Sequence, residues 1–267
     1  KLIWAVLFLS AVFLGLYAFG FQILRDDIVR FDDQRAGRPN QDLPYAIQAS
    51  AMVLLGLYTV NFLAGIMTIF ASVGAIASEI EAGTLHAIIP KPLSRWEIIA
   101  GKYLGFMAMI SVYLGLMVGG VALISRFVGD YTPPGLLEGL GLMILVSAIL
   151  LSLTMLGSTI FSTMANGVVV FMLYGMAVTG GLVEQIGTAL DNDTMVRIGV
   201  VSSIMLPSDA MWKLASYVVQ PTVAVNTIGP NPLGTAAPPS DFAVRYAILY
   251  CITLVIASML IFRRRDI

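Results

Sequence analysis

Long apolar runs without a charged residue alternate with short charged segments along the chain. A helix needs about 20 consecutive apolar residues to cross the hydrocarbon core of a bilayer. The longest run, residues 139–183, is long enough for two such helices, and we expect a turn at residues 162–167, where small and polar residues cluster. The pattern therefore predicts an all-α polytopic membrane protein with six transmembrane helices in a single domain, residues 1–267. The predicted spans cover about residues 2–24, 46–78, 103–125, 138–161, 167–183 and 242–262.

The segment between the second and third spans, residues 79–102, has its own pattern of helix signals. Gly83 is a natural helix stop, and residues 84–89 can form a short helix that ends before Pro90. A new helix then starts at Ser94, because Ser94 and Glu97 form a capping box. We therefore predict a short transverse element held between two spanning helices. An ordinary interfacial loop is the alternative interpretation.

The segment between the fifth and sixth spans, residues 184–241, is the longest one outside the predicted spans. We expect a first helix that ends near Pro207 and a second that begins at Ser208. The second is amphipathic, which favours a helix lying on the outer membrane surface or tucked partly into it. A loop rich in proline and glycine follows. A gate near the exit of a translocation path and a surface cover both fit this segment.

The composition agrees with a membrane protein. Hydrophobic residues make up 58% and charged residues 12%, and the mean hydropathy is +0.89. This shortage of charge argues against a soluble enzyme or a disordered protein, and the net charge of −1 offers no basic surface for nucleic acid. With a single histidine and a single cysteine, the chain lacks the usual ligands of a zinc site and cannot form an internal disulfide.

The chain does not have a nucleotide-binding P-loop. Its only Gly-Lys pair is Gly101-Lys102, but Trp96 occupies the position of the first glycine and Tyr103 that of the Ser/Thr. We therefore expect no catalytic residue on this chain. His86 fits a polar contact at a subunit interface better than a proton carrier or a catalytic base.

Two polar residues are candidates for a translocation path. Asn61 is the most deeply placed amide of the second span, and a hydrogen bond between helices is the competing interpretation. Glu184 falls near the end of the fifth span, where it faces either a lateral opening or solvent.

Six spans place both termini on the same side of the membrane. The basic triplet of residues 263–265 directly follows the last span and favours the cytoplasm for that side. The first apolar run is longer than the core of a signal peptide, so we expect a membrane anchor. Because the sequence starts at Lys1 and not at Met, we also expect further residues before it.

The segment of residues 79–102 resembles the signature of the ABC-2 family of ABC-transporter permeases. That signature is an acidic Glu-x-Glu-x-Gly-Thr, a short hydrophobic segment, Lys-Pro-Leu/Ile-Ser-Arg and then Gly-Lys. The family's ending, an aromatic residue followed by basic residues and aspartate, is similar to residues 262–266 here. The matching residues of the main motif are Glu79, Glu81, Gly83, Thr84, Lys91, Pro92, Leu93, Ser94, Arg95, Gly101 and Lys102.

The resemblance implies the membrane subunit of an ATP-driven exporter, most simply in a prokaryotic cytoplasmic membrane. Two permease subunits, as a homodimer or a heterodimer, would assemble with two copies of a separate ATPase subunit, which would bind ATP and magnesium. Membrane lipids would surround the complex. Residues 79–102 would form the cytoplasmic coupling helix, and the segment after the fifth span would be extracytoplasmic. The docking residues would be Glu79, Glu81, Gly83, Thr84, Leu85, His86, Lys91, Pro92, Ser94 and Arg95.

Two other functions remain open at this stage. An ABC-type complex could transmit ATPase motion to an extracytoplasmic partner, in a maturation or immunity role, and the mixed-charge residues 25–42 would then be a docking surface. A secondary transporter driven by an ion gradient would need an intramembrane carboxylate or a pair of broken helices, and neither is visible in the sequence.

Overall fold

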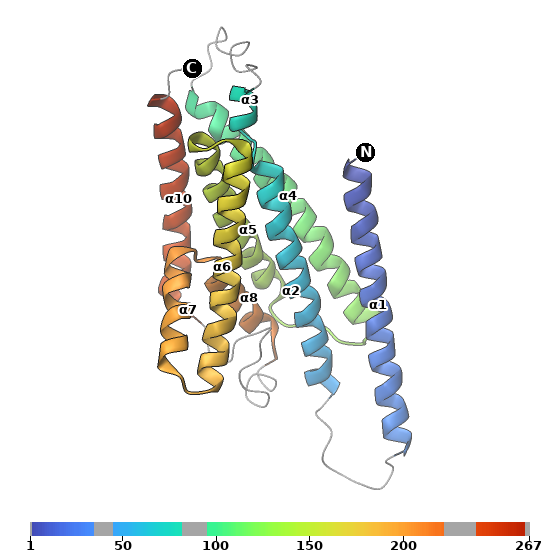
Figure 1. Cartoon of the computed structure of the whole chain (residues 1–267). Helices are drawn as coiled ribbons and strands as arrows, with labels where there is room; N and C mark the ends of the chain where they lie inside the picture. Colours follow the sequence, from blue (N-terminus) through green and yellow to red (C-terminus); the bar gives the residue numbers. More distant parts are fainter. Residues whose placement is uncertain (1, 35–44, 82–94, 222–238, 265–267) are drawn as a thin grey trace.

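The computed structural model describes residues 2–34, 45–81, 95–221 and 239–264, and every regular element within these ranges is a helix. Six of the helices are long and apolar enough to cross a membrane, as the uncharged runs predicted. They run side by side along the bundle (Figure 1). In chain order they are α1 (Leu2–Gln34), α2 (Tyr45–Ser72), α4 (Arg95–Phe127), α5 (Leu136–Ile160), α6 (Thr163–Ala189) and α10 (Asp241–Arg264).

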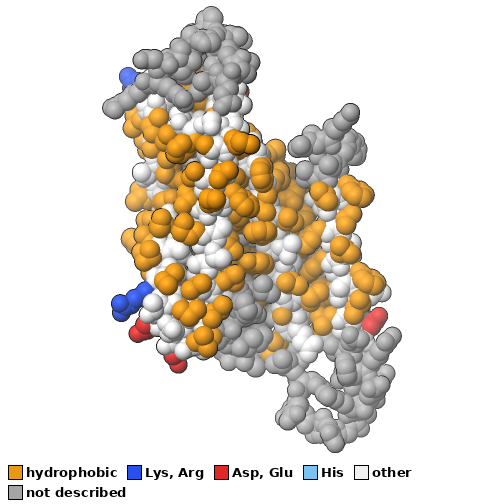
Figure 2. Space-filling view, in the orientation of Figure 1, with side chains coloured by type: hydrophobic (Ala, Val, Ile, Leu, Met, Phe, Trp, Pro, Cys, Tyr) orange, Lys and Arg blue, Asp and Glu red, His pale blue; other side chains and the backbone are white. Residues whose placement is uncertain are grey.

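The outer surface of these helices is apolar over the middle of the bundle. Figure 2 shows hydrophobic side chains covering the central part of one face, with charged side chains toward the two ends. Leu104 and Val112 of α4, Met172 of α6 and Leu249 of α10 all have more than 60% of their surface exposed. Such exposure costs nothing in contact with lipid, so it agrees with a multi-pass membrane protein.

The turn between α5 and α6 is tighter than the predicted turn at residues 162–167. Only Phe161 and Ser162 connect the two helices, and both have extended backbone conformations. Helix α6 therefore begins before the predicted start of the fifth span and also continues past residue 183. As a result, Glu184 lies inside α6 and not after it.

Helix α2 ends earlier than the predicted second span. It stops at Ser72, a turn covers residues 73–76, and the short helix α3 (Ala77–Glu81) follows. Both chain ends lie at the same end of the bundle as α3 (Figure 1). We call this the α3 end, and the opposite end the α7 end.

Two further helices, α7 (Asp193–Met205) and α8 (Ser208–Val219), lie between α6 and α10. With 13 and 12 residues they are too short to cross a bilayer. Helix α7 folds back along α6, and α8 packs against α5.

Helix α8 was expected on the outer membrane surface or tucked partly into it, because its sequence is amphipathic. In the structure it packs against α5. It is tucked into the bundle, and both its apolar residues, such as Met211 and Ala215, and its polar residue Lys213 are buried. Side chains on both its apolar and its polar side are therefore packed inside the protein.

Candidate functional site

The predicted coupling segment is described only at its two ends. Glu79 and Glu81 belong to α3, Arg95 is the first residue of α4, and Lys102 lies two turns later. Gly83, Thr84, Leu85, His86, Lys91, Pro92 and Ser94 fall outside the described residues, so their part in docking remains a prediction.

The turn between α2 and α3, residues 73–76, is tied to α4 by Lys102. The ammonium Nζ of Lys102 lies 2.5 Å from Oε2 of Glu79, and it also donates a hydrogen bond to the carbonyl oxygen of Ala75. One side chain of α4 therefore contacts both the turn and α3.

Helices α5 and α6 hold the same turn by hydrogen bonds to its backbone. Ser158 Oγ of α5 accepts from the backbone N–H of Ile76 at 2.9 Å and of Ala77 at 3.0 Å. Asn166 Nδ2 of α6 donates to the carbonyl oxygen of Val73 at 2.9 Å and of Thr154 at 3.0 Å. The bonds to Ile76, Ala77 and Val73 satisfy backbone groups at the break between α2 and α3, and the bond to Thr154 joins α6 to α5. We call this arrangement the braced turn.

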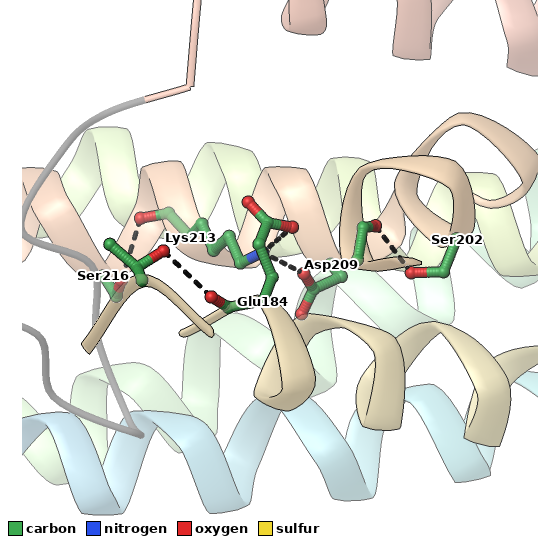
Figure 3. A network of polar contacts seen from close by, with 7 residues as sticks. Glu184, Ser202, Asp209, Lys213 and Ser216 are labelled. Carbon is green, nitrogen blue, oxygen red and sulfur yellow. Dashed lines mark hydrogen bonds and ion pairs between the residues drawn. The ribbon is translucent and has the colours of Figure 1, made fainter. Parts of the chain in front are cut away.

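A second polar cluster joins α6 to α8 near the α7 end. Lys213 Nζ lies 2.8 Å from Oε2 of Glu184 and 2.8 Å from Oδ2 of Asp209, one helical turn earlier in α8. Figure 3 shows the lysine between the two carboxylates. The side chains of Lys213, Asp209 and Glu184 are 6%, 9% and 24% exposed. We call these three residues the ionic cluster.

Burial and mutual attraction oppose each other in this cluster. Burial lowers the pKa of the Lys213 ammonium, but the carboxylates of Asp209 and Glu184 together raise that pKa above its ordinary value. The pKa of Asp209 lies above its ordinary value, because burial and the charge of Glu184 raise it, although the nearby Lys213 lowers it. With all three residues ionised, the cluster carries one net negative charge.

Glycines allow the helices around the cluster to approach closely. A Cβ on Gly181 of α6 would fall 2.1 Å from Oδ1 of Asp209, and one on Gly199 of α7 would fall 2.2 Å from Cβ of Glu184. Asp209 also lies in the first turn of α8, where the helix dipole favours a carboxylate. The ionic cluster therefore depends on the close helix packing at Gly181 and Gly199 as well as on its ion pairs.

Two carbonyl groups in the last turn of α7 accept hydrogen bonds from side chains of α10. The Tyr246 hydroxyl donates to the carbonyl oxygen of Ile204 at 2.7 Å, and the Tyr250 hydroxyl donates to that of Met205 at 3.0 Å. The last carbonyl groups of a helix receive no N–H donor from the helix itself, and here the two tyrosines supply the donors.

Asn61 lies on the other side of α8. It is 7% exposed and lines a small cavity together with Tyr58, Ser208, Asp209 and Trp212. Neither Asn61 Oδ1 nor Ser208 Oγ has a hydrogen-bond partner among the described residues. The expected bond between helices is therefore not made by this oxygen, and Asn61 and the ionic cluster meet at α8.

The sequence reasoning proposed Asn61 and Glu184 but missed Asp209 and Lys213. Their spacing of four residues within a stretch of low charge was the available signal, since such a pair can form one ion pair on a helix. No group of three histidine, cysteine, aspartate or glutamate residues could hold a metal ion in the part of the chain that the structure describes.

Comparison with protein families gives one match. A family model described as ABC-2 family transporter protein matches residues 1–267. None of the curated proteins compared with the chain matches it.

Proposed function

The chain belongs to the ABC-2 family of transporter proteins, and from this premise we propose that it is the transmembrane permease subunit of an ATP-driven exporter. It is a multi-pass membrane protein with six candidate spans. In our proposal it forms the translocation path, and a separate ATPase subunit binds and hydrolyses ATP. Two copies of that subunit and a second permease subunit complete the complex, with both termini in the cytoplasm.

The braced turn is the observation that carries this proposal. Only the short helix α3 separates it from residues 82–94, the part of the predicted coupling segment that lies outside the described residues. Side chains of α4, α5 and α6 hold it through Lys102, Ser158 and Asn166. A force applied to α3 would therefore reach three spanning helices without a flexible joint. That is the mechanical requirement for a membrane subunit moved by another protein.

The polar contacts of α8 support a role for this helix at the far end of the path. The two sequence candidates Asn61 and Glu184 approach α8 from α2 and α6. We propose that α8 closes the path at the α7 end, and that the ionic cluster holds the closed position.

The coupling proposal is tested by copurification with the ATPase. The tagged full chain is isolated from its native membranes, and the copurified ATPase subunit is quantified. We expect Arg95→Glu to reduce the amount of bound ATPase strongly, because Arg95 begins α4 next to the proposed docking segment. Arg126→Glu is the matched control, since Arg126 lies in the last turn of the same helix, at the other end.

Equal copurification of the ATPase with both variants would contradict docking at this segment. Loss of ATPase from both would show that a charge reversal anywhere on α4 disturbs assembly, and docking would then be tested by Thr84→Lys in the segment itself.

A second candidate function is transport driven by an ion gradient. One observation favours it, namely the buried carboxylate of Asp209, which follows the break between α7 and α8 at Pro207. Sequence reasoning did not detect this combination. Transport by the purified chain in liposomes with an ion gradient, but without an ATPase, would support this function over the first.

A further inference from the structure

The small cavity beside Asn61 lies between α2, α5, α6 and α8. It offers about 20 Å³ to a water-sized sphere, and a buried water molecule needs about 10–15 Å³ on the same measure. Organic ligands occupy pockets of about 300–1,000 Å³. The cavity therefore has room for one water molecule or one small ion, but not for an organic ligand.

Two buried side chains present unsatisfied oxygen atoms to this cavity. Asn61 is 7% exposed and Ser208 is 2% exposed, and neither Asn61 Oδ1 nor Ser208 Oγ has a hydrogen-bond partner among the described residues. Asp209 lines the same cavity and is the one charged residue among its described lining residues. Buried polar atoms that have no protein partner are usually bonded to ordered water.

Asn61 lies too deep in the bundle to reach the water outside a membrane. Helix α2 has 28 residues, with sixteen before Asn61 and eleven after it, which correspond to about 24 Å and 16 Å of helix. When α2 crosses a hydrocarbon core of about 30 Å, that core therefore contains Asn61. The amide oxygen needs a partner inside the protein.

One water molecule matches these groups in number and kind. An amide oxygen and a carboxylate only accept hydrogen bonds, whereas a serine hydroxyl can also donate one. A water molecule has two O–H donors and can also accept, so it can donate to Asn61 and Asp209 and accept from Ser208. The resulting three hydrogen bonds are the usual number for a buried water molecule.

A metal cation fits the same cavity less well. The ammonium Nζ of Lys213 lies 2.8 Å from Oδ2 of Asp209, so this carboxylate is already paired with a positive charge. Ser208 and Asp209 also begin α8, and the helix dipole places partial positive charge at this end of a helix. Hard cations such as Mg²⁺ and Ca²⁺ also require about six or more oxygen ligands.

We propose that the cavity binds one ordered water molecule, which joins Asn61 of α2 to Ser208 and Asp209 of α8. Lys213 joins α8 to Glu184 of α6, so polar contacts hold α8 to both α2 and α6. The proposal concerns a site on this chain alone, and it does not depend on whether α8 closes a translocation path.

The experiment is X-ray hydroxyl-radical footprinting of the purified full chain in detergent, because radiolysis of a bound water molecule oxidises the side chains beside it. Trp212 lines the cavity and is 5% exposed, so radicals from bulk water reach it poorly. We expect its oxidation rate to lie within a few-fold of that of Trp96, which is 57% exposed. A buried tryptophan without a water molecule beside it would be oxidised far more slowly.

Two variants and a control test the assignment. Asn61→Leu removes the accepting oxygen and should lower the oxidation of Trp212 several-fold, because apolar cavities stay dry. Thr59→Val is the matched control, since Thr59 lies on the same helix, donates to the carbonyl oxygen of Leu55 and does not line the cavity. Ser208→Ala is a smaller change that should also lower the oxidation of Trp212, and it keeps the proposal testable if Asn61→Leu fails to fold.

Thermal unfolding distinguishes a water molecule from a cation. The Tm is measured in NaCl, KCl and N-methylglucamine chloride at equal concentration, and we expect the three values to agree. A rise in Tm with one metal ion that Asn61→Leu abolishes would overturn the proposal and favour the ion-driven function. Slow oxidation of Trp212 in the natural chain, or unchanged oxidation in both Asn61→Leu and Ser208→Ala, would also overturn it.

Discussion

Lys213 holds two carboxylates together, of which Asp209 is buried and Glu184 is partly exposed. Replacing it with methionine would leave Asp209 and Glu184 beside each other without a positive charge. Removing one partner from a buried ion pair typically costs about 3–5 kcal/mol. We expect Lys213→Met to lower the Tm of the purified chain by roughly 10 °C, as measured by thermal unfolding in detergent.

The control for this prediction is the double variant Lys213→Met/Asp209→Asn, which removes one of the two unbalanced charges. It should recover part of the lost Tm. A Lys213→Met variant as stable as the natural chain would contradict the role given to the ionic cluster.

Asp209 should make the stability of the chain depend on pH. Its pKa in the folded chain lies above the ordinary value of 3.8 because of burial. Between 3.8 and the folded pKa the folded chain therefore holds a proton that the unfolded chain releases, and the contribution of Asp209 to stability falls as pH rises through this window. The raised pKa of Lys213 keeps the lysine charged throughout it.

The measurement compares the Tm of the natural chain with that of Asp209→Asn at several pH values below neutrality. As pH is lowered, the Tm of the natural chain should rise relative to the Tm of Asp209→Asn. If the Tm of the natural chain instead fell relative to that of the variant, attraction to Lys213 would outweigh the effect of burial on the pKa of Asp209.

Among the elements, the braced turn depends on a serine of α5. Ser158 accepts hydrogen bonds from two backbone N–H groups, and leaving a buried donor unpaired costs about 1–3 kcal/mol. We expect Ser158→Ala to lower the Tm and, in the assembled complex, to weaken the stimulation of ATP hydrolysis by transport. Ser147→Ala is the control, because Ser147 is buried in the same helix and its hydroxyl has no partner in the described region. Equal effects of both changes would argue against a special role for the turn.

The close contact of α6 with α7 depends on Gly187. A Cβ there would lie 2.6 Å from Cβ of Met195 and 2.9 Å from the backbone nitrogen of Val196, which cannot move independently of α7. Gly187→Ala should therefore lower the Tm. Gly175→Ala on the same helix meets no atom within 4 Å, so it should be neutral or stabilise the helix by about 0.5–1 kcal/mol. If both variants unfolded at the same temperature, the close contact at Gly187 would not contribute to the stability of the chain.

The spanning helices were predictable, but the position of α8 was not. A membrane span can be identified from the length of an apolar run and its lack of charged residues, which are local properties of the sequence. The orientation of α8 depends instead on Glu184, a residue of another helix that pairs with Lys213. The interpretation of an amphipathic helix assumes that its polar side chains face water. In α8, Lys213 and Asp209 instead pair with each other, and Lys213 also pairs with Glu184.

The break between α2 and α3 was also hidden from sequence reasoning. Its hydrogen bonds come from Ser158 and Asn166, more than 80 residues away along the chain. No local proline marks the turn, and an apolar helix through residue 78 was the natural expectation. Long-range partners of this kind are invisible in a single sequence.

For the whole molecule, the arrangement of the ends can be tested by chemical labelling. Both termini and α3 lie at one end, and the connection between α6 and α7 lies at the other (Figure 1). In a background with Cys251→Ser, Trp96→Cys should react with a membrane-impermeant maleimide only from the cytoplasmic side. Asp193→Cys should react only from the opposite side. Reaction of both cysteines from one side would contradict a membrane-crossing bundle, and the reverse pattern would invert our orientation.

The two tyrosines that complete α7 impose an order on biosynthesis. Tyr246 and Tyr250 belong to α10, which leaves the ribosome after α7. Until α10 is inserted beside it, the end of α7 exposes carbonyl groups that lipid cannot satisfy. A chain that ends before Tyr246 would therefore keep the carbonyl groups of Ile204 and Met205 without the donors that α10 supplies.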